Sequence, residues 1–81
     1  MDRMDKFLRR LSAEELIVVE EVVGRILTRK LGALDHKKLK DTADVYRVRV
    51  RDVRIIFQMN DRNIRIITIG RRNEQTYRDI H

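Results

Sequence analysis

The chain has 81 residues, 42% of them hydrophobic and 40% charged, which is enough for one domain of modest stability, spanning residues 1–81. It has no cysteine, which excludes disulfides and thiolate metal sites, and no apolar run approaches the roughly 20 residues that cross a membrane, so a cytoplasmic location is expected. The net charge of +6 indicates either a polyanionic partner or a role in solubility alone.

The N-terminal third predicts two helices. Apolar residues recur at helical spacing in two stretches, Phe7, Leu8 and Leu11, then Leu16, Val19, Val23, Ile26 and Leu27. Ser12 followed by Glu15 has the spacing of a capping box, which starts the second helix near residue 12. With Gly32 as its C-cap, this helix should span roughly 12–31. Gly24 inside it indicates close packing against a neighbouring element.

The rest of the chain predicts a connector and three strands. Residues 33–44 are interpreted as a connector whose lysines are solvated. Alternation predicts a strand at 45–51, and further strands follow at 52–60 and 63–70, joined by an Asn/Asp-rich turn that tolerates left-handed backbone. Residues 71–81 are expected to form a tail or a short helix. The predicted fold is α+β, with both helices on one face of a three-stranded antiparallel meander.

Arginines crowd one face of this predicted sheet. Side chains alternate along a strand, so Arg47, Arg49 and Arg51 share a face of the first strand, and Arg54 joins them from the second. Like charges opposite each other destabilise a sheet. The cluster therefore indicates an anion site, above all for nucleic-acid phosphate, unless acidic groups from elsewhere neutralise it.

Residues 7–79 resemble the RelE/ParE toxin superfamily of bacterial type II toxin–antitoxin systems. The motifs that carry the resemblance are "KLK" at 38–40, "YRVRV" at 46–50, "RIIF" at 54–57, and "IGRR" at 69–72 with a tyrosine after it. RelE-like members are ribosome-dependent mRNA endonucleases that act in the ribosomal A site, and ParE-like members inhibit DNA gyrase. The full set of motifs favours the RelE-like branch.

The resemblance implies a site without metal or other cofactor, in which the RNA 2′-hydroxyl attacks its own phosphodiester. The implied catalytic residues are Arg54, Arg72 and Tyr77. The implied RNA-backbone contacts are Arg47, Arg49 and Arg71, the last also an alternative to Arg72. The other interpretation is a ParE-like gyrase inhibitor, or an inactive homologue that acts only by binding its antitoxin.

Two departures from the family pattern bear on this interpretation. Members usually begin with a strand before the first helix, which is not predicted here, so a sheet edge is expected to be open. Family members often carry lysines at the positions of Arg47 and Arg49, and their replacement by arginine here leaves the general base unassigned. His36 and His81 are interpreted as surface residues. The implied partners are mRNA in the ribosomal A site and a cognate antitoxin, which would cover the arginine face or the open edge with Ile56 and Ile67.

Overall fold

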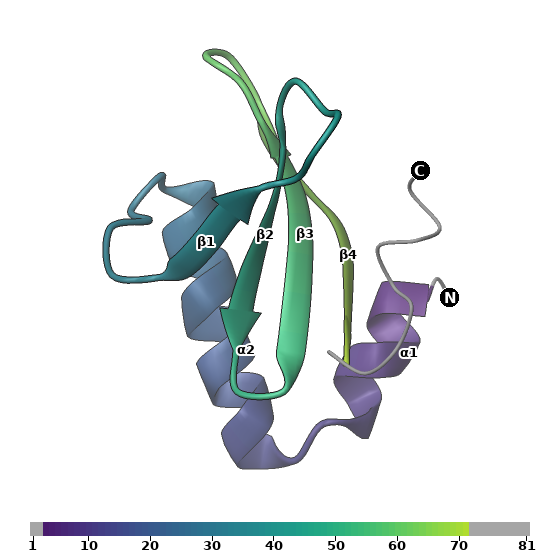
Figure 1. Cartoon of the computed structure of the whole chain (residues 1–81). Helices are drawn as coiled ribbons and strands as arrows, with labels where there is room; N and C mark the ends of the chain where they lie inside the picture. Colours follow the sequence, from purple (N-terminus) through teal and green to yellow (C-terminus); the bar gives the residue numbers. More distant parts are fainter. Residues whose placement is uncertain (1–2, 72–81) are drawn as a thin grey trace.

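The computed structural model describes residues 3–71, which form two helices and one antiparallel sheet (Figure 1). The helices are α1 (Arg3–Arg10) and α2 (Ala13–Leu27), and the strands are β1 (Asp35–Lys38), β2 (Val45–Val50), β3 (Val53–Met59) and β4 (Ile64–Arg71). The strand order is β1-β2-β3-β4. α2 lies along one face of the sheet and α1 lies beside β4 (Figure 1). The predicted α+β class is confirmed.

The prediction of three strands is wrong, because the connector supplies a fourth. Asp35–Lys38 pairs antiparallel with β2, and all four of its residues are exposed. The sequence Asp-His-Lys-Lys has no apolar alternation, so backbone hydrogen bonding to β2, and not burial of side chains, holds this strand. A search for period-two hydrophobicity cannot detect such a strand.

The predicted start of α2 is confirmed by both bonds of its capping box. The Glu15 backbone N–H donates to Ser12 Oγ over 3.1 Å, and the Ser12 N–H donates to Glu15 Oε1 over 3.2 Å. The helix buries Val19, Val22 and Ile26, each of which contributes about 1.5–3 kcal/mol of transfer free energy. Within residues 3–71, neither helix is long and apolar enough to cross a membrane.

The predicted end of α2 is four residues too late. The helix ends at Leu27, and Arg29 reverses the chain with a φ of 61°. The Arg29 N–H donates to the Ile26 carbonyl over 3.0 Å, and the Lys30 N–H donates to the Arg25 carbonyl over 2.8 Å. These two bonds make a Schellman motif with arginine at the left-handed position that glycine usually occupies. Gly32, the expected C-cap, has no part in it.

Gly24 does not mark close packing, contrary to the prediction. A Cβ atom added at Gly24 would meet nothing within 4 Å, and the residue is exposed. It lies on the outer side of α2 together with Ile17 and Leu27, the two exposed large hydrophobic residues in the described part of the chain. The packing of α2 on the sheet therefore does not depend on this glycine.

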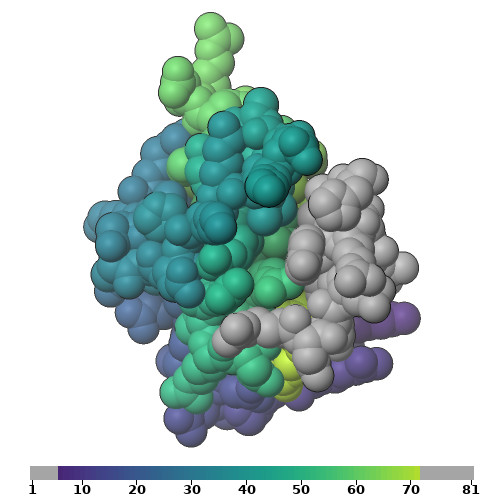
Figure 2. All heavy atoms as spheres, in the orientation of Figure 1, coloured from purple at the N-terminus to yellow at the C-terminus, as the bar shows by residue number. Residues whose placement is uncertain are grey.

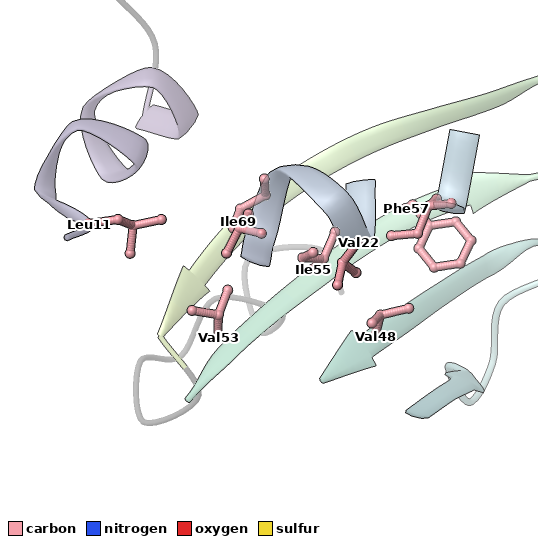
Figure 3. Packing of buried hydrophobic residues seen from close by; sticks show 9 residues of the cluster. Leu11, Val22, Val48, Val53, Ile55, Phe57 and Ile69 are labelled. Atoms are coloured by element: carbon pink, nitrogen blue, oxygen red, sulfur yellow. The ribbon is translucent and has the colours of Figure 1, made fainter. Parts of the chain in front are cut away.

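The core lies between α2 and one face of the sheet. Val48, Ile55 and Ile69 stand directly opposite one another on β2, β3 and β4 and point towards α2 (Figure 3). Phe57 is fully buried next to them, and its ring stacks on that of Tyr46 with centroids 5.6 Å apart. The core is otherwise aliphatic, as the scarcity of aromatic residues indicates.

A β-bulge in β4 explains why this strand is apolar at both odd and even positions. The register shifts between Ile56 and Phe57, which pair with Thr68 and Ile66, so Ile67 is an extra residue on β4. Before the bulge the even-numbered residues face α2, and after it the odd-numbered residues do. Ile64 and Ile66 before the bulge and Ile69 after it therefore all pack against the core on the side of α2.

Both hairpin turns occur where they are predicted, near Asp52 and after Met59, but their backbone conformations differ from the prediction. Arg51 and Asp52 make a two-residue turn in which Arg51 has a φ of 53°, so it leaves the strand to which the alternation assigned it. Its guanidinium pairs with Glu14 over 3.2 Å. The β3–β4 turn projects from one end of the molecule (Figure 2). There Asn60 Oδ1 accepts hydrogen bonds from the turn's own backbone, and no left-handed residue is needed.

Candidate nucleic-acid interface

The sheet face away from α2 gathers five cationic side chains, which we call the basic face: Lys37, Arg47, Arg49, Arg54 and Arg65. The strand register establishes this grouping, because residues directly opposite each other share a face. Lys37 stands opposite Arg47, and Arg49 stands opposite Arg54. Arg65 stands opposite Gln58 of β3, which lies on the same side as Arg54. The predicted clustering of Arg47, Arg49 and Arg54 is therefore present.

Arg49 and Arg54 are two like charges that stand directly opposite each other on neighbouring strands of the basic face. Directly opposed residues on antiparallel strands have Cβ atoms about 4.5–5.5 Å apart, and like charges in such a pair destabilise the sheet. Arg49 Nε is buried and has no hydrogen-bond partner among residues 3–71. A buried donor without an acceptor costs about 1–3 kcal/mol. This arrangement favours an anion that satisfies the donor and offsets the charge.

Arg47 has an acidic neighbour that the sequence did not reveal. Its Nη1 lies 3.3 Å from Asp35 Oδ1 and also donates to the Asp35 carbonyl over 3.3 Å. The Arg47 side chain is only 12% exposed, whereas that of Asp35 is 63% exposed. Asp35 reaches this face because β1 is a strand, where it stands opposite Arg49. One acid therefore offsets part of the positive charge.

A polar relay holds the cation at the other end of the basic face. Arg65 Nε donates to Gln58 Oε1 over 3.0 Å, and Gln58 Nε2 donates to both carboxylate oxygens of Asp44 over 3.2 and 3.1 Å. Gln58 thus joins a cation and an acid that lie on either side of β3. Both oxygens of Asp44 are engaged by this amide.

An apolar residue lies among the cations. Ile56 stands between Arg47 on β2 and Thr68 on β4, and its side chain is fully buried although it faces away from α2. It is not part of the cluster that packs on α2. The basic face therefore combines charged groups with an apolar floor, as the alternation of β3 predicts.

Arg71, a predicted RNA contact, lies on the other side of the sheet. It stands opposite Val53, a core residue, and its Nη1 pairs with Glu15 Oε2 over 2.8 Å and with Asp52 Oδ1 over 2.9 Å. Its guanidinium also lies 5.7 Å from the centre of the Phe7 ring. Arg71 therefore ties the end of β4 to both helices and to the β2–β3 turn.

Glu15 and Arg71 are coupled electrostatically. The hydrogen bond from Arg71 is the largest cause that lowers the pKa of Glu15, and with the backbone N–H of Ser12 it brings that pKa to about 2. The pKa of Arg71 is raised, chiefly by its hydrogen bond to Glu15. Both groups are therefore charged at neutral pH, and Glu15 serves the helix cap and the ion pair at once.

The remaining predicted residues are not part of this geometry. Arg72, Tyr77 and His81 lie outside the described residues. His36 stands opposite Val48, so it lies on the α2 side of β1, where its Nδ1 is 3.0 Å from the Leu34 carbonyl oxygen. Within residues 3–71, no three histidine, aspartate or glutamate side chains are grouped to hold a metal ion.

Comparison with known proteins shows the fold of the chain. No protein-family model matches the sequence, and the search of curated proteins returned no match. Among solved structures, the chain is similar to one chain of the crystal structure of the RelB–RelE antitoxin–toxin complex from Methanococcus jannaschii. The identity is 20% and the TM-score 0.73, over 99% of this chain and 94% of that one. The protein therefore has the fold of a chain in a toxin–antitoxin complex.

Proposed function

We propose that this protein is the toxin of a type II toxin–antitoxin system and that it cleaves mRNA in the ribosomal A site. The observation that carries the proposal is the direct opposition of Arg49 and Arg54 beside Arg47, on the sheet face that α2 leaves uncovered. Such a pair destabilises a protein that has no anionic ligand. The phosphates of an RNA backbone supply negative charge beside these cations and an acceptor for Arg49 Nε, which has none among residues 3–71.

The similarity of fold alone does not decide whether this chain corresponds to the antitoxin or to the toxin of that complex. Charge supports the toxin in this proposal, because the chain carries +6 and its cations gather on one face of a sheet. An antitoxin, in turn, is the partner whose acidic or apolar segments would relieve that repulsion. We place it on the basic face or along an outer edge of the sheet, near Ile56 and Ile67.

The proposed chemistry is attack by the RNA 2′-hydroxyl on the adjacent phosphodiester. Negative charge then develops on the phosphorus oxygens, and preorganised guanidinium groups stabilise it. Arg54 and Arg72 hold the scissile phosphate, Arg47 and Arg49 contact the neighbouring backbone, and Tyr77 orients the base or the proton path. Arg71 is engaged with Glu15, so its proposed contribution is to fix the end of β4 from which Arg72 follows.

The lack of a proton acceptor among the arginines of the basic face supports a second candidate function. Arginine cannot be deprotonated in a protein, so none of the four arginines of the basic face can accept the proton of the 2′-hydroxyl. A ParE-like gyrase inhibitor, or a homologue that only binds an antitoxin, needs no such group. The two functions differ in one observable, which is whether new 5′ ends arise in cellular mRNA.

The test is inducible expression with growth curves and mapping of mRNA 5′ ends. Loss of one guanidinium that contacts the transition state should reduce cleavage about 100- to 1,000-fold, by analogy with loss of an oxyanion-hole donor. Arg54→Ala and Arg72→Ala should therefore relieve growth arrest. Arg62→Ala removes the same charge from the exposed β3–β4 turn and should leave the arrest intact.

Three outcomes would count against the proposal. Equal relief from all three variants would indicate diffuse electrostatic binding in place of a site. Growth arrest without new mRNA 5′ ends, but with inhibited DNA supercoiling, would support the gyrase inhibitor. A parent protein without any effect on growth would support the homologue that only binds an antitoxin.

A further inference from the structure

Asp35 brings a carboxylate to the edge of the basic face. Its Oδ1 is held 3.3 Å from Arg47 Nη1, and the residue stands opposite Arg49, which in turn stands opposite Arg54. Its side chain is 63% exposed, and its Oδ2 accepts no hydrogen bond from residues 3–71. An accessible acceptor oxygen therefore lies beside the cations to which an RNA phosphate is assigned.

Cleavage by a 2′-hydroxyl requires a group that can take its proton. The arginines and the lysine of the basic face are cations, and His36 lies on the other side of the sheet. Asp44, a second carboxylate next to the basic face, has both oxygens engaged by Gln58 Nε2. Of these two carboxylates, Asp35 is thus the one with an oxygen that accepts no hydrogen bond from residues 3–71.

We propose that Asp35 is the general base of RNA cleavage on the basic face, an inference that rests on the proposed function. The carboxylate takes the proton of the 2′-hydroxyl, and the 2′-oxygen forms a bond to the adjacent phosphorus. The bond from phosphorus to the 5′-oxygen breaks, and that oxygen takes a proton from water. The resulting hydroxide removes the proton from Asp35. The products are a 2′,3′-cyclic phosphate and a 5′-hydroxyl end.

The arginines around Asp35 have separate tasks in this step. Arg47 donates to Oδ1 and to the Asp35 carbonyl, which fixes the side chain and the strand that carries it. Arg49 and Arg54 stabilise the negative charge on the phosphorus oxygens. The carboxylate would repel a phosphate in the absence of these cations, so the base is effective only where they surround it.

The test compares Asp35→Asn with Asp61→Asn, because each removes one negative charge and Asp61 lies exposed in the β3–β4 turn, away from the basic face. Single-turnover cleavage of mRNA on programmed ribosomes is measured with the purified proteins. Loss of a general base should slow cleavage about 100- to 10,000-fold for Asp35→Asn, and Asp61→Asn should stay within a few-fold of the parent. Asp35→Glu should recover part of the lost rate.

Binding is measured separately with an mRNA that carries a 2′-O-methyl group at the scissile nucleotide, which removes the nucleophile. Asp35→Asn should bind these ribosomes at least as tightly as the parent, since a negative charge near the phosphates is gone, and Asp61→Asn should bind within a few-fold of the parent. A slow Asp35→Asn variant that binds at least ten-fold more weakly would overturn the assignment, because Asp35 would then position RNA and not accept a proton.

The remaining outcomes separate this inference from the function on which it rests. An active parent with an Asp35→Asn variant as fast as Asp61→Asn overturns the role of Asp35 and leaves the proposed function standing. A parent that cleaves no mRNA on ribosomes overturns both.

Discussion

Arg49 offers a direct test of whether the basic face is a binding site that weakens the fold. Methionine has nearly the length of the arginine stem and keeps its packing, but it removes the charge and the buried Nε. Arg49→Met should therefore stabilise the protein and impair the proposed action on RNA. A residue that serves only the fold would show the opposite effect on stability.

The magnitude follows from three local terms. Removing the charge relieves about 0.2–1 kcal/mol of repulsion from Arg54 on β3 and loses about the same attraction to Asp35, which stands opposite on β1, so these two terms nearly cancel. Removing the buried Nε, which has no partner among residues 3–71, relieves about 1–3 kcal/mol. We expect a gain of about 1–3 kcal/mol in the free energy of unfolding, and each kcal/mol corresponds to about 4–8 °C in Tm for a domain of this size.

The measurement is thermal unfolding followed by circular dichroism. Arg62→Met at the exposed turn is the control, and its stability should change by less than about 0.5 kcal/mol. A Tm for Arg49→Met equal to or below that of the parent would refute the reasoning, because the guanidinium would then stabilise the unliganded fold.

Further predictions concern the helix and its cap. Gly24→Ala should stabilise the protein by about 1 kcal/mol, because a Cβ there meets nothing within 4 Å; urea unfolding checks this, and a loss of stability would show that the position is crowded. Arg29→Gly should relieve about 1 kcal/mol of left-handed strain at a φ of 61°, less the value of the bond from Arg29 Nη2 to the Asn60 carbonyl. Arg29→Ala loses that bond and keeps the strain, so it should be the less stable of the two variants in the same assay. The pKa of Glu15 is lowered from 4.5 to about 2, so the stability from its pairing with Arg71 is present above pH 4.5 and is lost as the pH falls towards 2. Glu15→Gln should flatten that part of the curve of Tm against pH, and an unchanged curve would contradict the coupling.

The sequence predicts those parts of the fold that burial of side chains determines. The start at Ser12, the alternation of β2 and the burial of Val19 and Ile26 follow from apolar spacing or from a local hydrogen-bond pattern. The face of α2 was predicted only in part, because Leu27 is exposed and Val22, which was not assigned to the face, is buried. The end of α2 does not, because Arg29 takes a conformation that favours glycine, and its cap is stabilised by backbone bonds that any residue can make. β1 was missed for a related reason, since its four residues bury no side chain.

The alternation of side chains along the strands predicts part of the candidate site. Arg47, Arg49 and Arg54 follow from alternation, and the register adds Arg65 and Lys37 only once the strand pairs are known. Alternation also assigns Arg51 to this face, and the resemblance implies Arg71 as an RNA contact, but both lie elsewhere. A two-residue turn takes the first of them out of its strand, and the bulge before the second changes the parity of β4. A one-residue change in register cannot be seen in a strand that is apolar on both sides.

The exposed strand β1 has a consequence for the dynamics of the sheet. It is joined to β2 by backbone hydrogen bonds and by the ion pair of Asp35 with Arg47, and its own four residues are exposed, so its separation should cost far less free energy than global unfolding. In native-state hydrogen exchange, the amides that join β1 to β2 should exchange well before those between β2 and β3. Each such opening carries Asp35 away from Arg47 and leaves the hydrophobic core intact.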